Sequence, residues 1–270
     1  MKNLKHTIII TGAGTGIGKA SSIALAKRGH KVYATCFKKE EVIFFNNLVK
    51  NDNSLDIISF KLDIRNLEDR NKLNNISFDR LICNAGIGDS GSITEVDTNK
   101  IINVFNTNVI SSIDLIQKAI HKWVNENNKN AKIIIIGSLA GKKAIPFLGP
   151  YCISKYAIEA FCECLRYELK LIKNSNISIS LIEPGSYYTG FNQLNCTKMY
   201  KWMKDKSYFK NILNNLHFYQ FKFWDLTEKK STKSIVKKYI KAVETTSKKF
   251  RYTAPFFQSL FIHLINILSI

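Results

Sequence analysis

The amino-acid sequence predicts an α/β fold, in which helices cover both faces of a doubly wound parallel sheet within a single domain of residues 1–270. Short runs rich in Ile, Val and Leu alternate with helical patterns along the chain, as repeated strand–helix–strand units do. These runs contain few polar residues, which is typical of parallel strands buried on both faces. Six strands are expected, at residues 7–10, 31–36, 56–61, 80–83, 132–136 and 178–182.

Helical patterns fill most of the chain between and after these strands. Five helices are expected, at residues 17–28, 40–50, 66–75, 99–125 and 152–172. Residues 187–230 break the alternation and are predicted to form an irregular, partly helical insertion. The first part of this insertion is rich in Phe, Tyr, Trp and Leu, which favours an apolar lid over a substrate pocket.

The first strand leads directly into TGAGTGIG, residues 11–18. Glycines let the backbone turn tightly and approach a pyrophosphate, and the helix that follows presents free N–H groups and the positive end of its dipole. The stretch therefore predicts a phosphate-binding turn. Gly14 is interpreted as a residue that only needs to be small.

Seven motifs in order, across roughly residues 7–190, resemble those of the short-chain dehydrogenase/reductase family. The glycine turn resembles the family's TGxxxGxG, and YCISK, residues 151–155, fits its YxxSK. The other matching positions are Leu62-Asp63, Asn84-Ala85-Gly86, Asn108, Ser138 within GSLAG, Pro184-Gly185 and Thr189. Residues 166–185 and 250–255 also resemble the branch that holds hydroxysteroid and retinol dehydrogenases.

This resemblance implies a Rossmann-type fold that binds NAD(P), and it assigns the residues of a cofactor site. Asp63 would contact the adenine, and Thr189 would lie over the nicotinamide, although it could equally be a plain helix cap. The expected cofactor-binding residues are Gly12, Thr15, Gly16, Ile17, Gly18, Lys38, Asp63, Asn84, Ala85, Gly86, Tyr151, Lys155, Pro184, Gly185 and Thr189.

The resemblance also implies a catalytic group of Ser138, Tyr151, Lys155 and Asn108. Tyr151 and Lys155 are four residues apart and so share one helix face, a spacing that on its own favours simple packing. A free tyrosine has a pKa near ~10, and a nearby ammonium is expected to lower it towards a working pH. Ser138 would bind the substrate oxygen, and Asn108 would position Lys155 through a water molecule.

The choice between the two nicotinamide cofactors depends on the end of the second strand. An acid there binds the ribose hydroxyls of NAD, whereas a basic residue accommodates the additional phosphate of NADP. The family's acid and arginine positions are occupied by Cys36 and Phe37, and Lys38 and Lys39 follow. The lysines favour NADP, with NAD as the alternative; both lysines could instead simply begin a solvated helix.

The net charge of +19 is unevenly distributed. Residues 198–251 hold fifteen Lys or Arg and four Asp or Glu. Such asymmetry favours an anionic substrate or membrane, although Lys, Asn and Ile are abundant throughout. No nucleic acid is expected as a partner, because the sequence has no zinc finger, basic zipper or RNA-binding aromatic motif.

The six cysteines show no paired zinc spacing, so no metal site is expected. Reduced thiols in a cytoplasmic protein are the simplest interpretation, and residues 1–11 pass into a strand with no signal-peptide pattern.

Residues 255–270 carry no charge and are too short to span a bilayer, which takes ~20 apolar residues. They are expected to pack onto the domain or into the interface of a homodimer or homotetramer. A membrane-surface helix beside the basic segment is the alternative.

Together these observations predict an enzyme that interconverts a carbonyl and an alcohol on a small, lipophilic or acyl-type substrate. Two alternatives remain: a cofactor-binding sensor or scaffold without turnover, and a membrane-surface protein that only uses the fold as a support.

Overall fold

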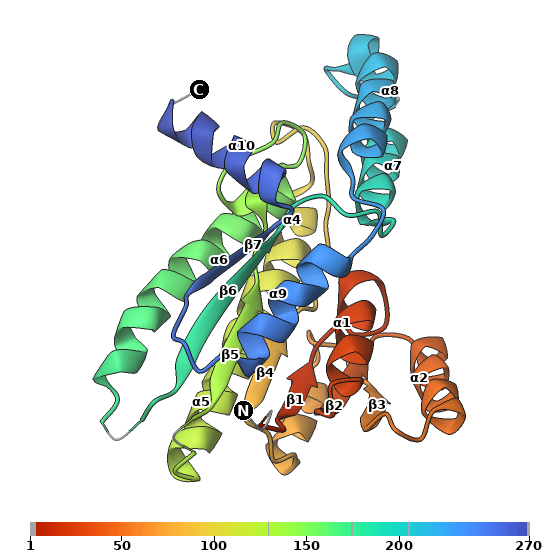
Figure 1. Ribbon diagram of the computed structural model, residues 1–270. Helices are drawn as coiled ribbons and strands as arrows, with labels where there is room; N and C mark the ends of the chain where they lie inside the picture. The colour runs from red at the N-terminus through yellow and green to blue at the C-terminus, as the bar shows by residue number, and fades with distance from the viewer. Residues whose placement is uncertain (1–3, 129, 174, 205, 269–270) are drawn as a thin grey trace.

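The computed structural model describes residues 4–128, 130–173, 175–204 and 206–268. Within them, seven parallel strands form one sheet in the order β3-β2-β1-β4-β5-β6-β7 (Figure 1). The strands are β1 Thr7–Ile10, β2 Lys31–Cys36, β3 Ile57–Lys61, β4 Arg80–Cys83, β5 Lys132–Ile136, β6 Ser178–Pro184 and β7 Arg251–Ala254. The predicted fold class is confirmed. β7 was not expected, because RYTA alternates polar and buried positions and lacks the density of Ile and Val that marks the other strands.

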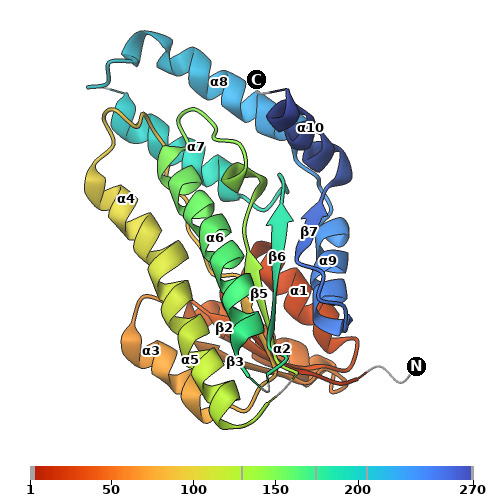
Figure 2. The same cartoon turned by 90° about the vertical axis from the view of Figure 1, so that its left-hand side faces the viewer.

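Helices cover both faces of the sheet (Figure 2). One face carries α1 Gly16–Ala26, α2 Lys39–Asn51 and α9 Lys233–Glu244, whose buried side chains pack with Ile8, Ile10 and Val32. The other face carries α5 Ser111–Asn125 and α6 Gly149–Glu168, which pack against strand residues such as Leu81 and Ile133. The remaining short helices are α3 Leu67–Asn71, α4 Thr98–Phe105 and the 3-10 turns η1 Lys72–Asn75, η3 Leu139–Gly141 and η4 Leu169–Leu171.

The helix expected at residues 99–125 is interrupted. Between α4 and α5 the chain forms the π-helical turn η2, Asn106–Ile110, which includes Asn108. Such turns widen the helix by one residue and are frequent at functional sites. Hydrophobic periodicity cannot reveal a change of this size, so the sequence indicated one continuous helix.

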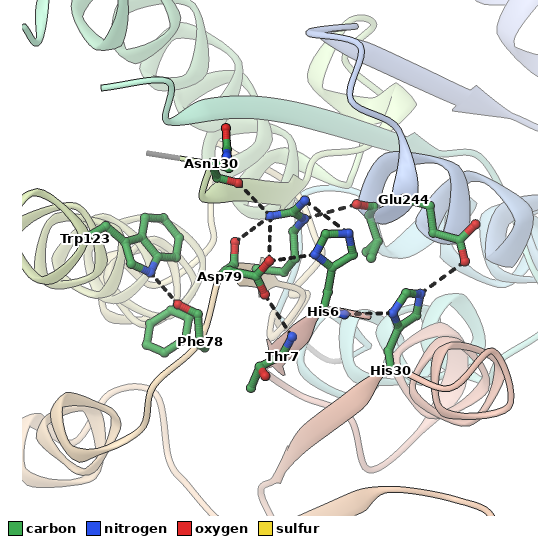
Figure 3. A network of polar contacts seen from close by, with 10 residues as sticks. His6, Thr7, His30, Phe78, Asp79, Trp123, Asn130 and Glu244 are labelled. Carbon is green, nitrogen blue, oxygen red and sulfur yellow. Dashed lines mark hydrogen bonds and ion pairs between the residues drawn. The ribbon is translucent and has the colours of Figure 1, made fainter. Parts of the chain in front are cut away.

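The amino ends of the strands are joined by a polar network (Figure 3). His6 Nδ1 lies 2.6 Å from Asp79 Oδ2, and Arg80 bonds both residues. The main-chain N–H of His6 donates to His30 Nδ1 at 3.2 Å, and His30 Nε2 lies 3.1 Å from Glu244 Oε1. The network joins the starts of β1, β2 and β4 to the end of α9, at the sheet edge opposite the glycine turn.

The segment predicted to be irregular is a helical hairpin of α7, Phe191–Met203, and α8, Lys210–Thr227. Its helices enclose a small core of Met199, Met203 and Leu213. Trp202 docks the hairpin on the segment after β4, because its Nε1 donates to the Ser90 carbonyl at 3.1 Å. The expectation of a partly helical segment is confirmed, but the segment is more regular than predicted. Asn and Lys interleaved with the aromatic residues blur the helical pattern in the sequence.

The apolar C-terminal segment forms α10, Phe256–Ile267, and residues 269 and 270 of that segment lie outside the described residues. No side chain of α10 is fully buried, although Gln258, Ser259, Ile262 and Ile265 are half-buried, so the helix packs only in part onto the domain. Packing in a subunit interface stays a prediction. Of the helices that the structure describes, none is both long and apolar enough to cross a membrane.

Candidate active site

The glycine turn after β1 has the backbone of an anion-binding site. Gly12 and Gly16 adopt φ values of +64° and +53°, which side chains other than glycine rarely tolerate. A Cβ on Gly12 would lie 2.7 Å from Ala85 Cα, and a Cβ on Gly18 would collide with the Gly12 carbonyl. Thr15 precedes α1 without a side-chain cap, and the first turn of α1 holds no acid. The predicted turn, including Ile17 in that first turn, therefore fits the pyrophosphate of a dinucleotide.

Asn84 holds this turn in place. Its Nδ2 donates to the carbonyls of Thr11 and Gly12, each at 2.9 Å, and its Oδ1 accepts from the Tyr239 hydroxyl at 2.8 Å. Asn84 and Ala85 also donate their main-chain N–H groups to Thr11 Oγ1, each at 3.0 Å. Asn84 is thus a positioning residue. Tyr239, fully buried on α9, was missed because nothing in the sequence links it to a residue so far along the chain.

The fold brings Ser138, Tyr151 and Lys155 together at the carboxyl edge of the sheet. Ser138 follows β5 and caps η3, where its Oγ accepts from Ala140 N at 3.1 Å. Tyr151 and Lys155 share the inner face of α6. Lys155 Nζ donates to the Ile136 carbonyl at 2.7 Å and lies 5.6 Å from the centre of the Tyr151 ring.

Burial governs the protonation of this group. It raises the pKa of Tyr151 to about 12, against a smaller lowering by the hydrogen bond with Ser138. Burial also lowers the pKa of Lys155 to about 8. The expected lowering of the tyrosine pKa by Lys155 is therefore not found, because desolvation of the phenolate outweighs the hydrogen bond with Ser138. Tyr151 is protonated at neutral pH and is ready to donate a proton.

Asn108 connects two parts of the site through its side chain. Its Oδ1 accepts from Ile87 N at 2.8 Å, and its Nδ2 donates to Ile87 O and Ser154 Oγ, each at 2.9 Å. Ser154 Oγ in turn donates to the Tyr151 carbonyl at 2.7 Å. Asn108 therefore positions the tyrosine helix against the segment after β4. Gly86 is needed beside it, because a Cβ there would lie 3.2 Å from Asn108 Oδ1.

The end of β2 holds a carboxylate that the sequence analysis missed. Glu41, in the first turn of α2, folds back so that Oε2 accepts from Phe37 N at 3.0 Å and Lys38 N at 3.1 Å. A Cβ on Gly14 would collide with this carboxylate, so Gly14 leaves room for it. No acid stands between Gly29 and Lys39, and Glu41 lies just beyond this stretch. The signal that could have revealed Glu41 is an acid three residues after the helix cap.

Asp63 forms an ion pair. Its carboxylate accepts two hydrogen bonds from the Arg65 side chain, at 3.0 and 2.8 Å, which hold the pKa of Asp63 below its usual range. Arg65 also lies 5.7 Å from the centre of the exposed Phe37 ring. These groups form the corner of the site where the adenine was expected.

The segment after β6 closes the other side of the glycine turn. Thr189 lies beside Gly16, since a Cβ on that glycine would be 3.4 Å from Thr189 Cβ. Pro184 ends β6, and Gly185 N donates to the Ala254 carbonyl at 2.8 Å. Gln258, another residue that the sequence analysis missed, accepts from Ser186 N at 2.7 Å and donates to Thr227 O at 2.8 Å. The start of α10 is therefore attached to the active-site segment.

The α7–α8 hairpin supplies an apolar wall for a substrate. The ring of Phe191 lies 5.3 Å from that of Tyr151. A separate apolar hollow of about 580 Å³ runs along the start of α6, between Ile93, Phe147 and Tyr156, but Ser138, Tyr151 and Lys155 do not line it. The hollow is therefore not the place where the reacting carbonyl would bind.

Comparisons with known proteins agree with this geometry. Residues 6–199 match the family described as short chain dehydrogenase. The 3-ketodihydrosphingosine reductase of Bacteroides thetaiotaomicron is 30% identical over 184 residues, which cover 68% of this chain and 65% of the relative. The NADPH-dependent 3-dehydrocapnine reductase of Ornithobacterium rhinotracheale is 31% identical over 189 residues, which cover 67% of this chain and 65% of the relative. The matches thus span just under two thirds of these relatives.

Among solved structures, a short chain dehydrogenase/reductase of Burkholderia phymatum in complex with NAD superimposes with a TM-score of 0.82. It is 19% identical, and the match covers 100% of this chain and 97% of that one, so it shows the shared fold. The match over residues 6–199 shows the family: the chain belongs to the short chain dehydrogenases.

Proposed function

We propose that this protein is an NAD(P)-dependent oxidoreductase that reduces a carbonyl to an alcohol on a lipophilic or acyl-type substrate. The observation that carries the proposal is the meeting of Ser138, Tyr151 and Lys155 at the carboxyl edge of the sheet. Burial of Tyr151 favours the protonated phenol there. A protonated phenol suits the proton donor of a reduction better than the base of an oxidation.

The residues divide the chemistry in the following way. A nicotinamide dinucleotide supplies the hydride when it is bound. Ser138 donates a hydrogen bond to the substrate oxygen as negative charge develops on it. Tyr151 transfers its phenolic proton to that oxygen, and the charge of Lys155 stabilises the phenolate that remains. Asn108 and Ser154 keep the tyrosine helix in register with the segment after β4.

The proposed substrate class is supported by Phe191 against Tyr151 and by the names of two relatives. These relatives are named as reductases of 3-ketodihydrosphingosine and of 3-dehydrocapnine, and the prefix in the first name denotes a ketone. In this chain the aromatic hairpin places the ring of Phe191 5.3 Å from that of Tyr151.

For the cofactor, we propose NADPH, with NADH as the alternative. Lys38 and Lys39 stand at the end of β2, and one relative is named NADPH-dependent. The carboxylate of Glu41 at the same corner acts in the opposite direction, since it would repel an additional phosphate. The preference for NADPH is therefore expected to be small.

The test is a fluorescence titration with NADPH and NADH, followed by a screen of carbonyl compounds with the cofactor that binds more tightly. Turnover by the wild type that is lost in Tyr151→Phe would support the proposal. Cofactor binding without turnover of any carbonyl or alcohol would favour a sensor instead. If neither cofactor binds, the proposal fails.

A further inference from the structure

Two helices leave apolar side chains uncovered beyond the carboxyl edge of the sheet. α10 and α8 both project past this edge (Figures 1 and 2). On α10, Phe256, Phe257 and Phe261 are 70%, 76% and 62% exposed. On α8, Phe218, Phe223 and Leu226 are 60%, 53% and 74% exposed. We call these six residues the distal apolar surface.

The two helices meet at their ends. Gln258 Nε2 of α10 donates to Thr227 O at the end of α8, at 2.8 Å, so Leu226 and Phe257 lie close to the same junction. Exposed apolar side chains in such a group mark a surface that is covered by something. α10 contains no charged residue, so nothing on it opposes an apolar environment.

Lysines lie beside the start of this uncharged helix. Lys229 and Lys230 follow α8 at the junction, next to the start of α10. At the other end, Asn266 Nδ2 donates to Lys142 O at 3.3 Å, but the Lys142 ammonium is paired with buried Glu183 at 2.9 Å. An apolar helix that begins beside a pair of lysines is complementary to a lipid surface that carries negative headgroups.

The length of α10 decides how it would lie. Twelve residues make a helix of about 18 Å, against a hydrocarbon core of roughly 30 Å. The helix is too short to cross the bilayer, but it is long enough to rest among the headgroups with its Phe side chains in the acyl region.

We propose that the distal apolar surface binds an anionic lipid membrane. Gln258 of α10 accepts from Ser186 N, directly after Pro184 and Gly185, so a bilayer on this surface would lie beside the active-site segment. Resting on the proposed function, this placement brings a membrane source of a lipophilic carbonyl close to the site that holds Tyr151. The membrane contact itself does not depend on catalysis.

The first test is sedimentation of the purified full chain with phosphatidylcholine vesicles, with and without a quarter of phosphatidylglycerol. The wild type should sediment with the anionic vesicles and be released by high salt. Phe257→Ser with Phe261→Ser should weaken binding by more than roughly tenfold. A matched control, Tyr167→Ser with Leu171→Ser, removes two equally exposed apolar residues at the far end of α6 and should bind as the wild type does.

Charge is tested separately. Lys229→Glu with Lys230→Glu should weaken binding by more than roughly tenfold, while Lys27→Glu with Lys50→Glu makes the same change in net charge elsewhere and should have a much smaller effect. A wild type that sediments with neither vesicle overturns the proposal. The proposal is also overturned, in favour of a subunit interface, if the wild type does not bind vesicles and is a dimer in light scattering while the α10 double variant is a monomer.

Turnover of a water-soluble carbonyl, measured without vesicles, tests the enzymatic proposal independently of membrane binding. If the α10 double variant keeps this turnover and no longer binds the vesicles, both proposals hold. If the wild type binds vesicles without turning over any carbonyl, only the enzymatic proposal fails.

Discussion

Lys155 points its ammonium at the main chain, not at the phenol that it is expected to assist. Nζ is 2.7 Å from the Ile136 carbonyl and 5.6 Å from the centre of the Tyr151 ring. The lysine is thus anchored to the strand that ends just before Ser138. With the lysine at that distance, burial determines the tyrosine pKa.

The rates of the two directions should therefore depend differently on pH. Carbonyl reduction needs the protonated phenol, so kcat/KM for reduction should not decline through loss of the Tyr151 proton between pH 6 and 9. Alcohol oxidation needs the phenolate, and with a pKa of about 12 its fraction rises about tenfold per pH unit over this range. Oxidation that levels off near pH 7 would show that the tyrosine pKa is low.

Removing the phenolic hydroxyl should abolish the proton transfer. Tyr151→Phe is expected to lower kcat by roughly 10²–10⁴-fold, because a positioned acid contributes about that much. Cofactor affinity, measured by fluorescence, should change little. Tyr156→Phe is the control on the same helix, since Tyr156 is 43% exposed and is not in the catalytic group. Equal activity of both variants would exclude Tyr151 as the acid.

Glu41 should limit the preference for NADPH. Glu41→Gln removes a negative charge at the end of β2, so the affinity for NADPH relative to NADH should rise by roughly 3- to 10-fold. Glu40→Gln, at the exposed neighbouring position, should leave this ratio unchanged. Parallel titrations of the two cofactors give the ratio directly.

Lys38 should act in the opposite direction. Lys38→Asp replaces the proposed phosphate contact by a repelling charge, and it should weaken NADPH more than NADH. An equal loss for both cofactors would mean that Lys38 only begins a solvated helix, and the preference for NADPH would then have to come from elsewhere in the site.

The sequence predicted the sheet well because most of the first six strands are dense in Ile, Val and Leu, and it predicted the catalytic group from ordered motifs. It could not predict contacts that depend on tertiary structure. Tyr239 meets Asn84 across 155 positions, and Gln258 meets Ser186 across 72. Glu41 was missed for a different reason. It lies in the first turn of α2, and its side chain folds back towards the end of β2. The π-helical turn at Asn108 changes the chain by too little to disturb the hydrophobic pattern.

Asn108 should contribute to stability as well as to catalysis. Asn108→Ala removes three hydrogen bonds of a buried side chain and leaves the Ile87 main chain without a partner, which should cost about 1–3 kcal/mol. The Tm should fall by roughly 2–4 °C per kcal/mol. Asn99→Ala, an exposed asparagine on α4, should leave the Tm unchanged. An unchanged Tm in Asn108→Ala would contradict the positioning role.

The polar network at the amino edge should make the fold sensitive to acid. Burial lowers the pKa of His30, so the folded protein binds a proton there less readily than the unfolded chain does. The free energy of unfolding should therefore be independent of His30 well above pH ~6.5, and it should decrease as the pH falls below this value.

A second loss should follow at lower pH. Glu244 has a lowered pKa because hydrogen bonds with Arg28 and His30 outweigh its desolvation, so its contribution is present above pH ~4.3 and is lost as the pH falls through its folded value.

The measurement is urea unfolding between pH 8 and 4. His30→Gln should be about 1–2 kcal/mol less stable than the wild type at pH 8 and should lose less stability between pH 7 and 5, because the titrating group is gone. His121→Gln, at an exposed position on α5, should follow the wild-type curve. If His30→Gln and the wild type have the same slope over this range, the acid sensitivity comes from other groups, because a buried neutral His30 must bind its proton on unfolding.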